Sequence, residues 1–215
     1  MPHYALIGAT GLIGSHILAE LLQQPDATVT ILLRKPLNLN NPRVQEVVVD
    51  FTNEKVLTEA LAGCEAVFVS IGTTQKKVRG DLSAYRKIDY DIPVAAANAC
   101  VANAIPKLLV VSSVGANSRS NNFYLRIKGE VEDAIANRPI PYIRIFQPSL
   151  LLGNRTEFRL GEKISQIIMP WIGFLFPARY KPIAATTVAL AMVQAATTSE
   201  KGVKRYTYSD MKQPR

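Results

Sequence analysis

Three glycines at regular spacing, between an apolar segment and a helical pattern, constrain this chain more than any other feature. Gly8, Gly11 and Gly14 follow one another at intervals of three in HYALIGATGLIGSHILAELLQQ. The first permits a tight turn, the second lets the backbone approach a pyrophosphate, and the third allows the helix to pack closely on the strand. The helix N-terminus offers free N–H groups to phosphates. The loop therefore predicts a dinucleotide site; a turn that only reverses the chain is the alternative.

Apolar strand segments alternate with helical patterns along the chain. The strand segments are HYALIG (3–8), TVTILL (28–33), VQEVVV (44–49), EAVFVSIG (65–72), KLLVVSS (107–113) and PYIRIF (141–146). Such alternation indicates a parallel sheet, and nearly continuous apolar strands are typical of a sheet with helices on both faces. The predicted fold is α/β, with a doubly wound, mostly parallel sheet of the Rossmann type.

The helical patterns define the predicted domain. They cover GLIGSHILAELLQQ (11–24), SAYRKIDYDIPVAAANACVAN (83–103) and NFYLRIKGEVEDAIAN (122–137). Pro93 is expected to kink or divide the second of these helices. After Pro148 we expect helices around 156–169 and 183–196 and a short strand near VKRYTY. We predict one NAD(P)-binding domain over 1–215, with a dinucleotide-binding core (1–153) and a small C-terminal substrate-side region (154–215).

The charge of the chain permits an anionic partner, because the formal net charge is +8 over 215 residues. The basic residues are spread among Arg34 and Lys35, the loop 75–80, the segment 119–128 and the last fifteen residues. There is no basic helix and no interleaving of aromatic residues. We therefore expect a phosphorylated small molecule and no nucleic acid.

Composition also bears on metals, membranes and compartment. Cys64 and Cys100 lie far apart in apolar segments, and only two histidines are present, which argues against a metal site or disulfides. The apolar run 164–177 contains Pro170 and Gly173 and would reach about 21 Å as a helix, against roughly 30 Å for a bilayer core. It is expected in the core, a pocket lid or a subunit interface, in that order, with a contact on a membrane surface as a minor fourth alternative. The first residues lack a signal-peptide pattern, so we expect a cytoplasmic protein.

The end of the second strand segment bears on the choice of dinucleotide. An NAD site typically has a carboxylate about 20 residues beyond the glycine loop, which binds the ribose hydroxyls of adenosine. Here the strand segment ends in Arg34 and Lys35 without an acid. A guanidinium pairs with a 2′-phosphate through charge-assisted hydrogen bonds and stacks on adenine. Arg34, assisted by Lys35, therefore predicts NADP(H); a solvated Arg-Lys turn is the alternative.

A second pattern carries possible proton chemistry. The fifth strand segment ends in VVSSVGA, Tyr124 follows Ser113 by eleven residues, and Lys128 lies four residues beyond Tyr124. Residues four apart lie side by side on a helix. An ammonium beside a phenol favours the phenolate, so Tyr124 would exchange a proton more readily. A packed tyrosine beside a solvated lysine is the alternative, because such pairs are common in proteins that catalyse nothing.

These motifs together resemble the short-chain dehydrogenase/reductase family over residues 4 to about 153. The resemblance implies that Ser113 holds the substrate oxygen, with Ser112 as the alternative. It implies that Tyr124 is the general acid/base and that Lys128 also binds the nicotinamide ribose. Where many relatives have an asparagine in the preceding long helix, this chain has Asp89 or Tyr90. The relay of protons described for those relatives is therefore not implied.

The resemblance also implies a set of cofactor contacts and no metal. Asp50 is expected near adenine, and the residues after the fourth strand segment are expected along the centre of the nucleotide. The implied cofactor-binding residues are Gly8, Thr10, Gly11, Leu12, Ile13, Gly14, Arg34, Lys35, Asp50, Phe51, Ser70, Ile71, Gly72, Lys128 and Pro148. A helix cap is the alternative for Asp50, and a chain turn is the alternative for Gly72.

More narrowly, VSSVGANSRSNNFYLRIKGEVEDAI and RIFQPSLLLGNRTEFRLGE resemble the atypical branch that includes the human Tat-interacting protein. The resemblance implies an NADP(H)-dependent oxidoreductase acting on a small carbonyl or alcohol. The alternative is an NADPH-binding regulatory or redox-sensing protein with a protein partner and little activity. Arg144, Arg155 and Arg159 are candidates for an anionic substrate or, more simply, structural cations. We expect no membrane span, and either a monomer or a homodimer.

Overall fold

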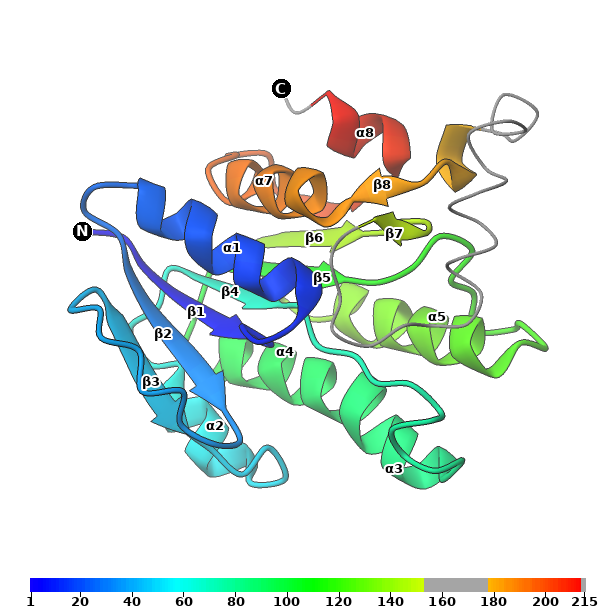
Figure 1. Cartoon of the computed structure of the whole chain (residues 1–215), viewed down its shortest axis with the longest axis horizontal. Helices are drawn as coiled ribbons and strands as arrows, with labels where there is room; N and C mark the ends of the chain where they lie inside the picture. The colour runs from blue at the N-terminus through cyan, green and yellow to red at the C-terminus, as the bar shows by residue number, and fades with distance from the viewer. Residues whose placement is uncertain (153–177, 214–215) are drawn as a thin grey trace.

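The computed structural model describes residues 1–152 and 178–213, and its centre is a seven-stranded parallel sheet (Figure 1). The strand order is β3-β2-β1-β4-β5-β6-β9, and every neighbouring pair runs in the same direction. The strands are β1 (His3–Ile7), β2 (Thr28–Leu33), β3 (Val44–Val48), β4 (Ala66–Val69), β5 (Lys107–Val111), β6 (Tyr142–Phe146) and β9 (Gly202–Tyr206). The prediction of a doubly wound Rossmann sheet is confirmed.

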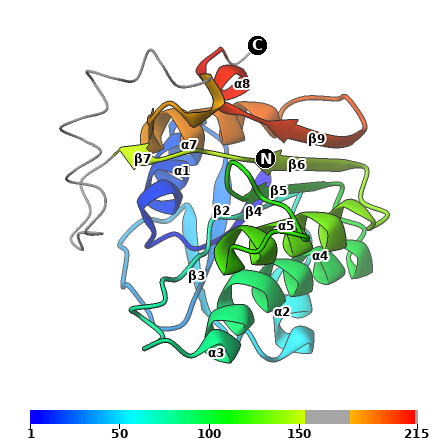
Figure 2. The same ribbon diagram turned by 90° about the vertical axis from the view of Figure 1, so that its right-hand side faces the viewer.

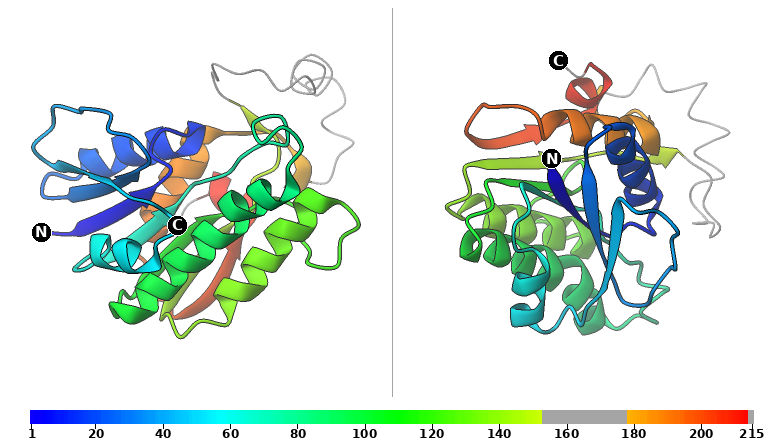
Figure 3. Two further views of the ribbon diagram at one scale, coloured as in Figure 1. Left: turned by 90° about the horizontal axis from the view of Figure 1, so that it is seen from below. Right: turned by 90° about the vertical axis from the view of Figure 1, so that its left-hand side faces the viewer.

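Helices cover both faces of this sheet (Figures 2 and 3). One face carries α1 (Leu12–Gln23) and α7 (Ala185–Ala195), and the other carries α2 (Glu54–Ala60), α4 (Ile92–Ala102) and α5 (Phe123–Ala136). The shorter helices are α3 (Leu82–Arg86) and α8 (Tyr208–Lys212). In β1, Leu6 joins the core under α1 and α7, while Ala5 and Ile7 join the opposite core. Burial on both faces is the reason that the strands are continuously apolar.

The strand order reverses between β1 and β4, and this reversal positions the site. The chain leaves β1 toward β2 and β3 and returns to β4 on the other side of β1, where Ile7 lies beside Val69. Ligands of doubly wound sheets bind outside the carboxyl ends of the strands at such a reversal. The glycine loop after β1 and the segment after β4 meet at this point.

Pro93 divides the predicted long helix without breaking its path. A π-helical turn (η1, Lys87–Asp91) connects α3 to α4, and Pro93 lies in the first turn of α4. Proline has no N–H with which to bond the carbonyl of Asp89, so the α-helical hydrogen-bond pattern fails here and the turn widens. The side chain of Asp89 lies in the interior, with 1% of its surface exposed.

Part of the C-terminal region is built into the main fold. The strand β9 pairs with β6, and α7 packs beside α1 over the sheet. Two short strands, β7 (Leu151–Leu152) and β8 (Ile183–Ala184), form a separate parallel pair, and a 3-10 turn, η3 (Ala178–Tyr180), precedes β8. The predicted helix at 156–169 and the apolar run 164–177 lie outside the described residues. None of the helices in 1–152 and 178–213 has both the length and the apolar character needed to cross a bilayer.

Candidate nucleotide and catalytic site

The glycine loop depends on two backbone contacts that no side chain would permit. Gly8 has φ of +96°, and a Cβ on it would lie 2.5 Å from the carbonyl oxygen of Ser70. A Cβ on Gly14 would lie 2.0 Å from the carbonyl oxygen of Gly8. Gly11 donates its N–H to the Gly8 carbonyl at 2.9 Å. The loop is therefore pressed between the end of β4 and the first turn of α1, as the sequence predicted for the first and third glycines.

The first turn of α1 is arranged to receive an anion. Its N-cap residue is Gly11, which has no side chain to accept the N–H groups of Ile13 and Gly14, the second and third residues of the helix. Thr10, in front of the cap, is exposed. Free N–H groups and the positive end of the helix dipole favour a phosphate at this position.

Arg34 and Lys35 lie exposed at the carboxyl end of β2, next to β1 in the sheet. The loop that follows is fixed by Glu46 of β3, whose carboxylate accepts the N–H groups of Leu37, Asn38 and Leu39. These hydrogen bonds, that of Leu39 first, hold the pKa of Glu46 below its usual value. The basic pair thus stands on an anchored loop at the same edge as the glycine loop.

Asp50 and Phe51 follow β3 at the same edge of the sheet. The Asp50 carboxylate accepts the N–H and the hydroxyl of Thr52 at 2.9 and 2.7 Å, and these bonds, the N–H first, lower its pKa. The N-cap of α2 is Asn53, so Asp50 closes a local turn and does not cap the helix. Phe51 is half-buried against the core under α2.

After β4, the segment Ser70, Ile71 and Gly72 runs toward α5. Ser70 touches the glycine loop, and Ile71 packs on the core. A Cβ on Gly72 would lie 3.4 Å from Asp89 Oδ1 and 4.0 Å from Lys128 Nζ. The structure therefore brings the predicted lysine of α5 next to the segment that follows β4.

Lys128 is not solvated. Its side chain is buried, and Nζ lies 3.0 Å from Oδ1 of Asp89, which is also buried. Asp89 is not among the residues that the sequence predicted for the site, where it stood out only as a departure from relatives. The available signal was an acidic residue at a position where many relatives have an amide.

The two serines after β5 have different partners. Ser112 donates its hydroxyl to buried Glu132 of α5 at 2.6 Å. Within the part of the chain that the structure describes, the hydroxyl of Ser113 has one hydrogen-bond partner, the adjacent carbonyl of Val114 at 3.3 Å. Val114 in turn donates its N–H to the carbonyl of Pro148, at 3.0 Å, which places buried Pro148 beside the serine pair. Ser112 is thus engaged in holding α5, which favours Ser113 as the serine available to a ligand.

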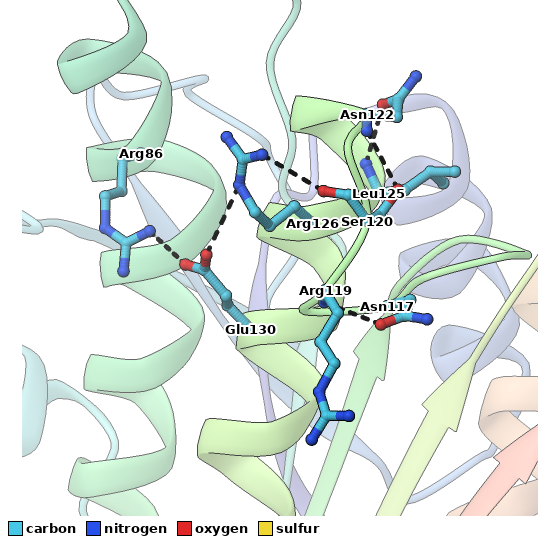
Figure 4. A network of polar contacts seen from close by, with 8 residues as sticks. All are labelled: Arg86, Asn117, Arg119, Ser120, Asn122, Leu125, Arg126 and Glu130. Carbon is cyan, nitrogen blue, oxygen red and sulfur yellow. Dashed lines mark hydrogen bonds and ion pairs between the residues drawn. The ribbon is translucent and has the colours of Figure 1, made fainter.

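Tyr124 lies half-buried in the first turn of α5, after the N-cap Asn122. The loop before the helix folds back on it, because Asn117 donates its N–H to the Leu125 carbonyl at 3.0 Å. Figure 4 shows the polar contacts around this loop, in which Arg126 reaches both Ser120 and Glu130.

The same network links α5 to the neighbouring helix. Arg86, the last residue of α3, donates to Glu130 (Figure 4). Its guanidinium also stacks over the ring of Tyr90, with 4.0 Å between the guanidinium carbon and the ring centroid. Of the two residues noted at the asparagine position of relatives, Tyr90 is therefore used in this contact, and Asp89 faces Lys128.

Other candidates fall outside the site. Arg144 is buried within β6 and donates to the carbonyls of Glu200, before β9, and of Gly202, the first residue of β9, so it is a structural cation. Arg155 and Arg159 lie outside the described residues. In 1–152 and 178–213, no group of three His, Cys, Asp or Glu side chains is arranged to hold a metal ion.

Comparisons with known proteins agree with this geometry. Residues 8–199 match the model of a family described as NAD(P)H-binding. The chain is 31% identical over 205 residues to the protein FMP52, mitochondrial, of Candida albicans, covering 92% of this chain and 88% of that one. It is 30% identical over 165 residues to the protein HTATIP2 of Rattus norvegicus, covering 75% of this chain and 67% of that one.

Among solved structures, the Bordetella bronchiseptica enzyme WbmH in complex with NAD⁺ matches with a TM-score of 0.74 and 16% identity, over 96% of this chain and 76% of that one. This match concerns the fold alone.

The comparisons also correct one expectation, the predicted location in the cell. The cytoplasmic assignment is wrong, because the relatives from Candida albicans, Emericella nidulans and Debaryomyces hansenii are named as mitochondrial proteins. The lack of a signal-peptide pattern, from which the cytoplasm was predicted, does not distinguish the cytoplasm from mitochondria.

Proposed function

This chain belongs to the NAD(P)H-binding family, as an atypical short-chain dehydrogenase/reductase, and we propose that it transfers hydride between NADPH and a small carbonyl or alcohol. The observation that carries the proposal is the position of Lys128, whose buried ammonium stands beside Gly72. Gly72 follows the strand next to the glycine loop, so one nucleotide lying across the strand ends would reach both features.

The proposed cofactor site has four parts. The N–H groups at the start of α1 bind the diphosphate, Arg34 with Lys35 binds the 2′-phosphate of adenosine, and Asp50 and Phe51 border the adenine. Ser70, Ile71, Gly72 and Pro148 line the nicotinamide half. Exposure of Arg34 and the lack of an acid after β2 support NADP(H) over NAD(H).

The bound cofactor supplies the hydride, and the chain supplies the proton and the orientation. For reduction, Ser113 donates a hydrogen bond to the carbonyl oxygen of the substrate. Tyr124 gives its phenolic proton to that oxygen as hydride reaches the carbon, so the product is a neutral alcohol. Lys128 binds the ribose hydroxyls on the nicotinamide side. The alcohol oxidation is the reverse.

The cofactor preference is tested separately from the chemistry. We expect NADPH to raise the melting temperature more than NADH at equal concentration, and Arg34→Glu to reverse this order, because a carboxylate repels the 2′-phosphate and suits free ribose hydroxyls. Equal stabilisation of the natural chain by both nucleotides would remove Arg34 from the proposal.

The chemistry is tested by NADPH oxidation across a panel of aldehydes, ketones and quinones. Tyr124→Phe should abolish turnover by about 100-fold or more and leave the nucleotide affinity within about twofold, because it removes only the proton donor. Retained turnover would exclude Tyr124 as the acid.

One observation favours a second function, an NADPH-dependent regulatory or redox-sensing protein with a protein partner. The Asp89 carboxylate offsets the positive charge of Lys128, so less positive charge is left in the site to assist the proposed reaction. In this case turnover is absent across the panel. Binding of the partner then depends on NADPH and survives Tyr124→Phe.

A further inference from the structure

A single buried carboxylate joins two segments of the proposed site. Asp89 Oδ1 lies 3.0 Å from Lys128 Nζ on α5, and Asp89 Oδ2 accepts the N–H of Thr73 at 2.7 Å, in the segment after β4. Asp89 and Lys128 are 1% and 5% exposed. From these contacts we infer that Asp89 is a positioning residue, which holds the Lys128 ammonium at the nicotinamide side and fixes the segment 70–73 against α5. This inference rests on the proposed function.

The site requires a carboxylate and not an amide. The two oxygens of Asp89 have different partners, since Oδ1 forms the ion pair with the ammonium and Oδ2 accepts a hydrogen bond from the backbone N–H. An asparagine has one acceptor oxygen and one NH₂ group, so it can serve only one of these donors and turns a donor toward the other. Leaving a buried donor unpaired is costly, above all when it is charged.

The π-helical turn η1 positions the carboxylate of Asp89 between the segment after β4 and α5. The Thr73 N–H is held by Asp89, and the Thr73 carbonyl accepts the hydroxyl of Tyr85 from the preceding turn, at 3.3 Å. Arg86, between them in sequence, pairs with Glu130 of α5. The stretch 85–89 therefore contacts both the segment after β4 and α5, and it sets their separation.

The consequence for binding concerns the hydrogens of Lys128. An ammonium has three N–H donors, and an ion pair with one carboxylate oxygen engages at most one of them, so the others can donate to the ribose hydroxyls. The ion pair holds the Lys128 side chain in place, so the side chain has little freedom left to lose when a nucleotide binds. Loss of the carboxylate should therefore weaken binding of the nicotinamide ribose and not of the adenosine half.

The test compares two ligands on matched variants. Calorimetry measures the Kd of NADP⁺, which reaches Lys128, and of adenosine 2′,5′-bisphosphate, which has no nicotinamide ribose. For Asp89→Asn we expect about tenfold weaker NADP⁺ binding, the loss typical of a charged hydrogen-bond partner, and less than about twofold change for the bisphosphate. Asp89→Glu keeps the charge but displaces it by one methylene, and should lie between Asp89→Asn and the natural chain.

The control is Glu132→Gln, which also neutralises a buried carboxylate. The Glu132 carboxylate contacts Ser112, Gln147 and Arg205 and not Lys128. This substitution should lower the melting temperature without a selective loss of NADP⁺ affinity. Unchanged NADP⁺ affinity in Asp89→Asn, equal losses for both ligands, or the same selective loss in Glu132→Gln would each overturn the inference. A natural chain that binds neither ligand would instead overturn the proposed function, and the inference with it. If Asp89→Asn does not fold, Asp89→Glu alone decides by the same comparison.

Discussion

Gly129 follows Lys128 in α5, at the point where the loop that leaves β5 lies against the helix. A Cβ added to Gly129 would lie 2.1 Å from the nitrogen of Ser118 and 2.2 Å from the carbonyl carbon of Asn117. Since Cβ contacts below 3.0 Å essentially do not occur, the loop would have to retreat by about 1 Å. The Asn117 N–H is hydrogen-bonded to the Leu125 carbonyl, so this retreat also strains or breaks that bond.

Two opposing effects decide the stability of Gly129→Ala. Alanine favours a helix over glycine by about 1 kcal/mol. Overpacking typically costs about 1–3 kcal/mol, and the upper end applies here because the clashing atoms are backbone that cannot rotate away. The clash therefore exceeds the gain, and we expect the free energy of unfolding to fall by about 2 kcal/mol.

Urea unfolding measures this free energy, and an unchanged m-value ensures that the same two states are compared. Ala19→Gly provides the calibration, since Ala19 is exposed on α1 and the change should cost about 1 kcal/mol from helix propensity alone. If Gly129→Ala raises the free energy of unfolding by as much as Ala19→Gly lowers it, the loop and the helix do not approach closely and the reasoning is refuted.

Three further predictions concern the frame of the site. Gly8→Ala and Gly63→Ala both place alanine at positive φ, but of these two positions only Gly8 would also bring the added Cβ against backbone. Gly8→Ala should therefore lower the free energy of unfolding in urea by about 1–3 kcal/mol more than Gly63→Ala does. Equal losses of free energy would contradict the contact between Gly8 and the end of β4. Glu132→Gln should cost about 1–3 kcal/mol by the same assay, and no loss would show that its hydrogen bonds contribute nothing net. Burial raises the pKa of the Cys64 thiol from 9.0 to about 11. Burial is also the largest of the causes that raise the pKa of the Cys100 thiol from 9.0 to about 12. Both thiols therefore stay protonated in the folded chain. Their contribution to the free energy of unfolding is complete below about pH 9, and it is lost as the pH rises through 11 to 12. Native protein at about pH 8 should resist a thiol reagent that labels both cysteines in urea, and rapid native labelling would contradict the burial.

The parts of the site that the sequence predicted are those fixed by local geometry. The intervals between Gly8, Gly11 and Gly14 require a particular turn, and the turn has the predicted contacts at its first and third glycines. The alternation of strands and helices likewise predicted the sheet, because each strand carries its own pattern of burial. In both cases the information lies within about twenty residues of chain.

The choice between Ser112 and Ser113 required contacts between distant segments. Counting residues leaves them equivalent, because either hydroxyl follows the same strand. The partner that separates them, Glu132, lies 20 positions away on α5. The role of Arg144 was also open for this reason, since the two carbonyls that it contacts, at the start of β9 and just before it, come from 56 and 58 positions further along the chain.

Lys128 raises the same issue in its strongest form. The spacing of Lys128 from Tyr124 shows only that the two residues share a helix face. The electrostatic role of Lys128 depends on the carboxylate of Asp89, which faces it from η1. The position of that carboxylate depends on the widened turn before Pro93, because a regular α-helix through 82–102 would rotate the residues before the proline to a different direction. One proline, remote from both motifs that define the family resemblance, thus determines whether the lysine of the site is an isolated charge or one member of an ion pair.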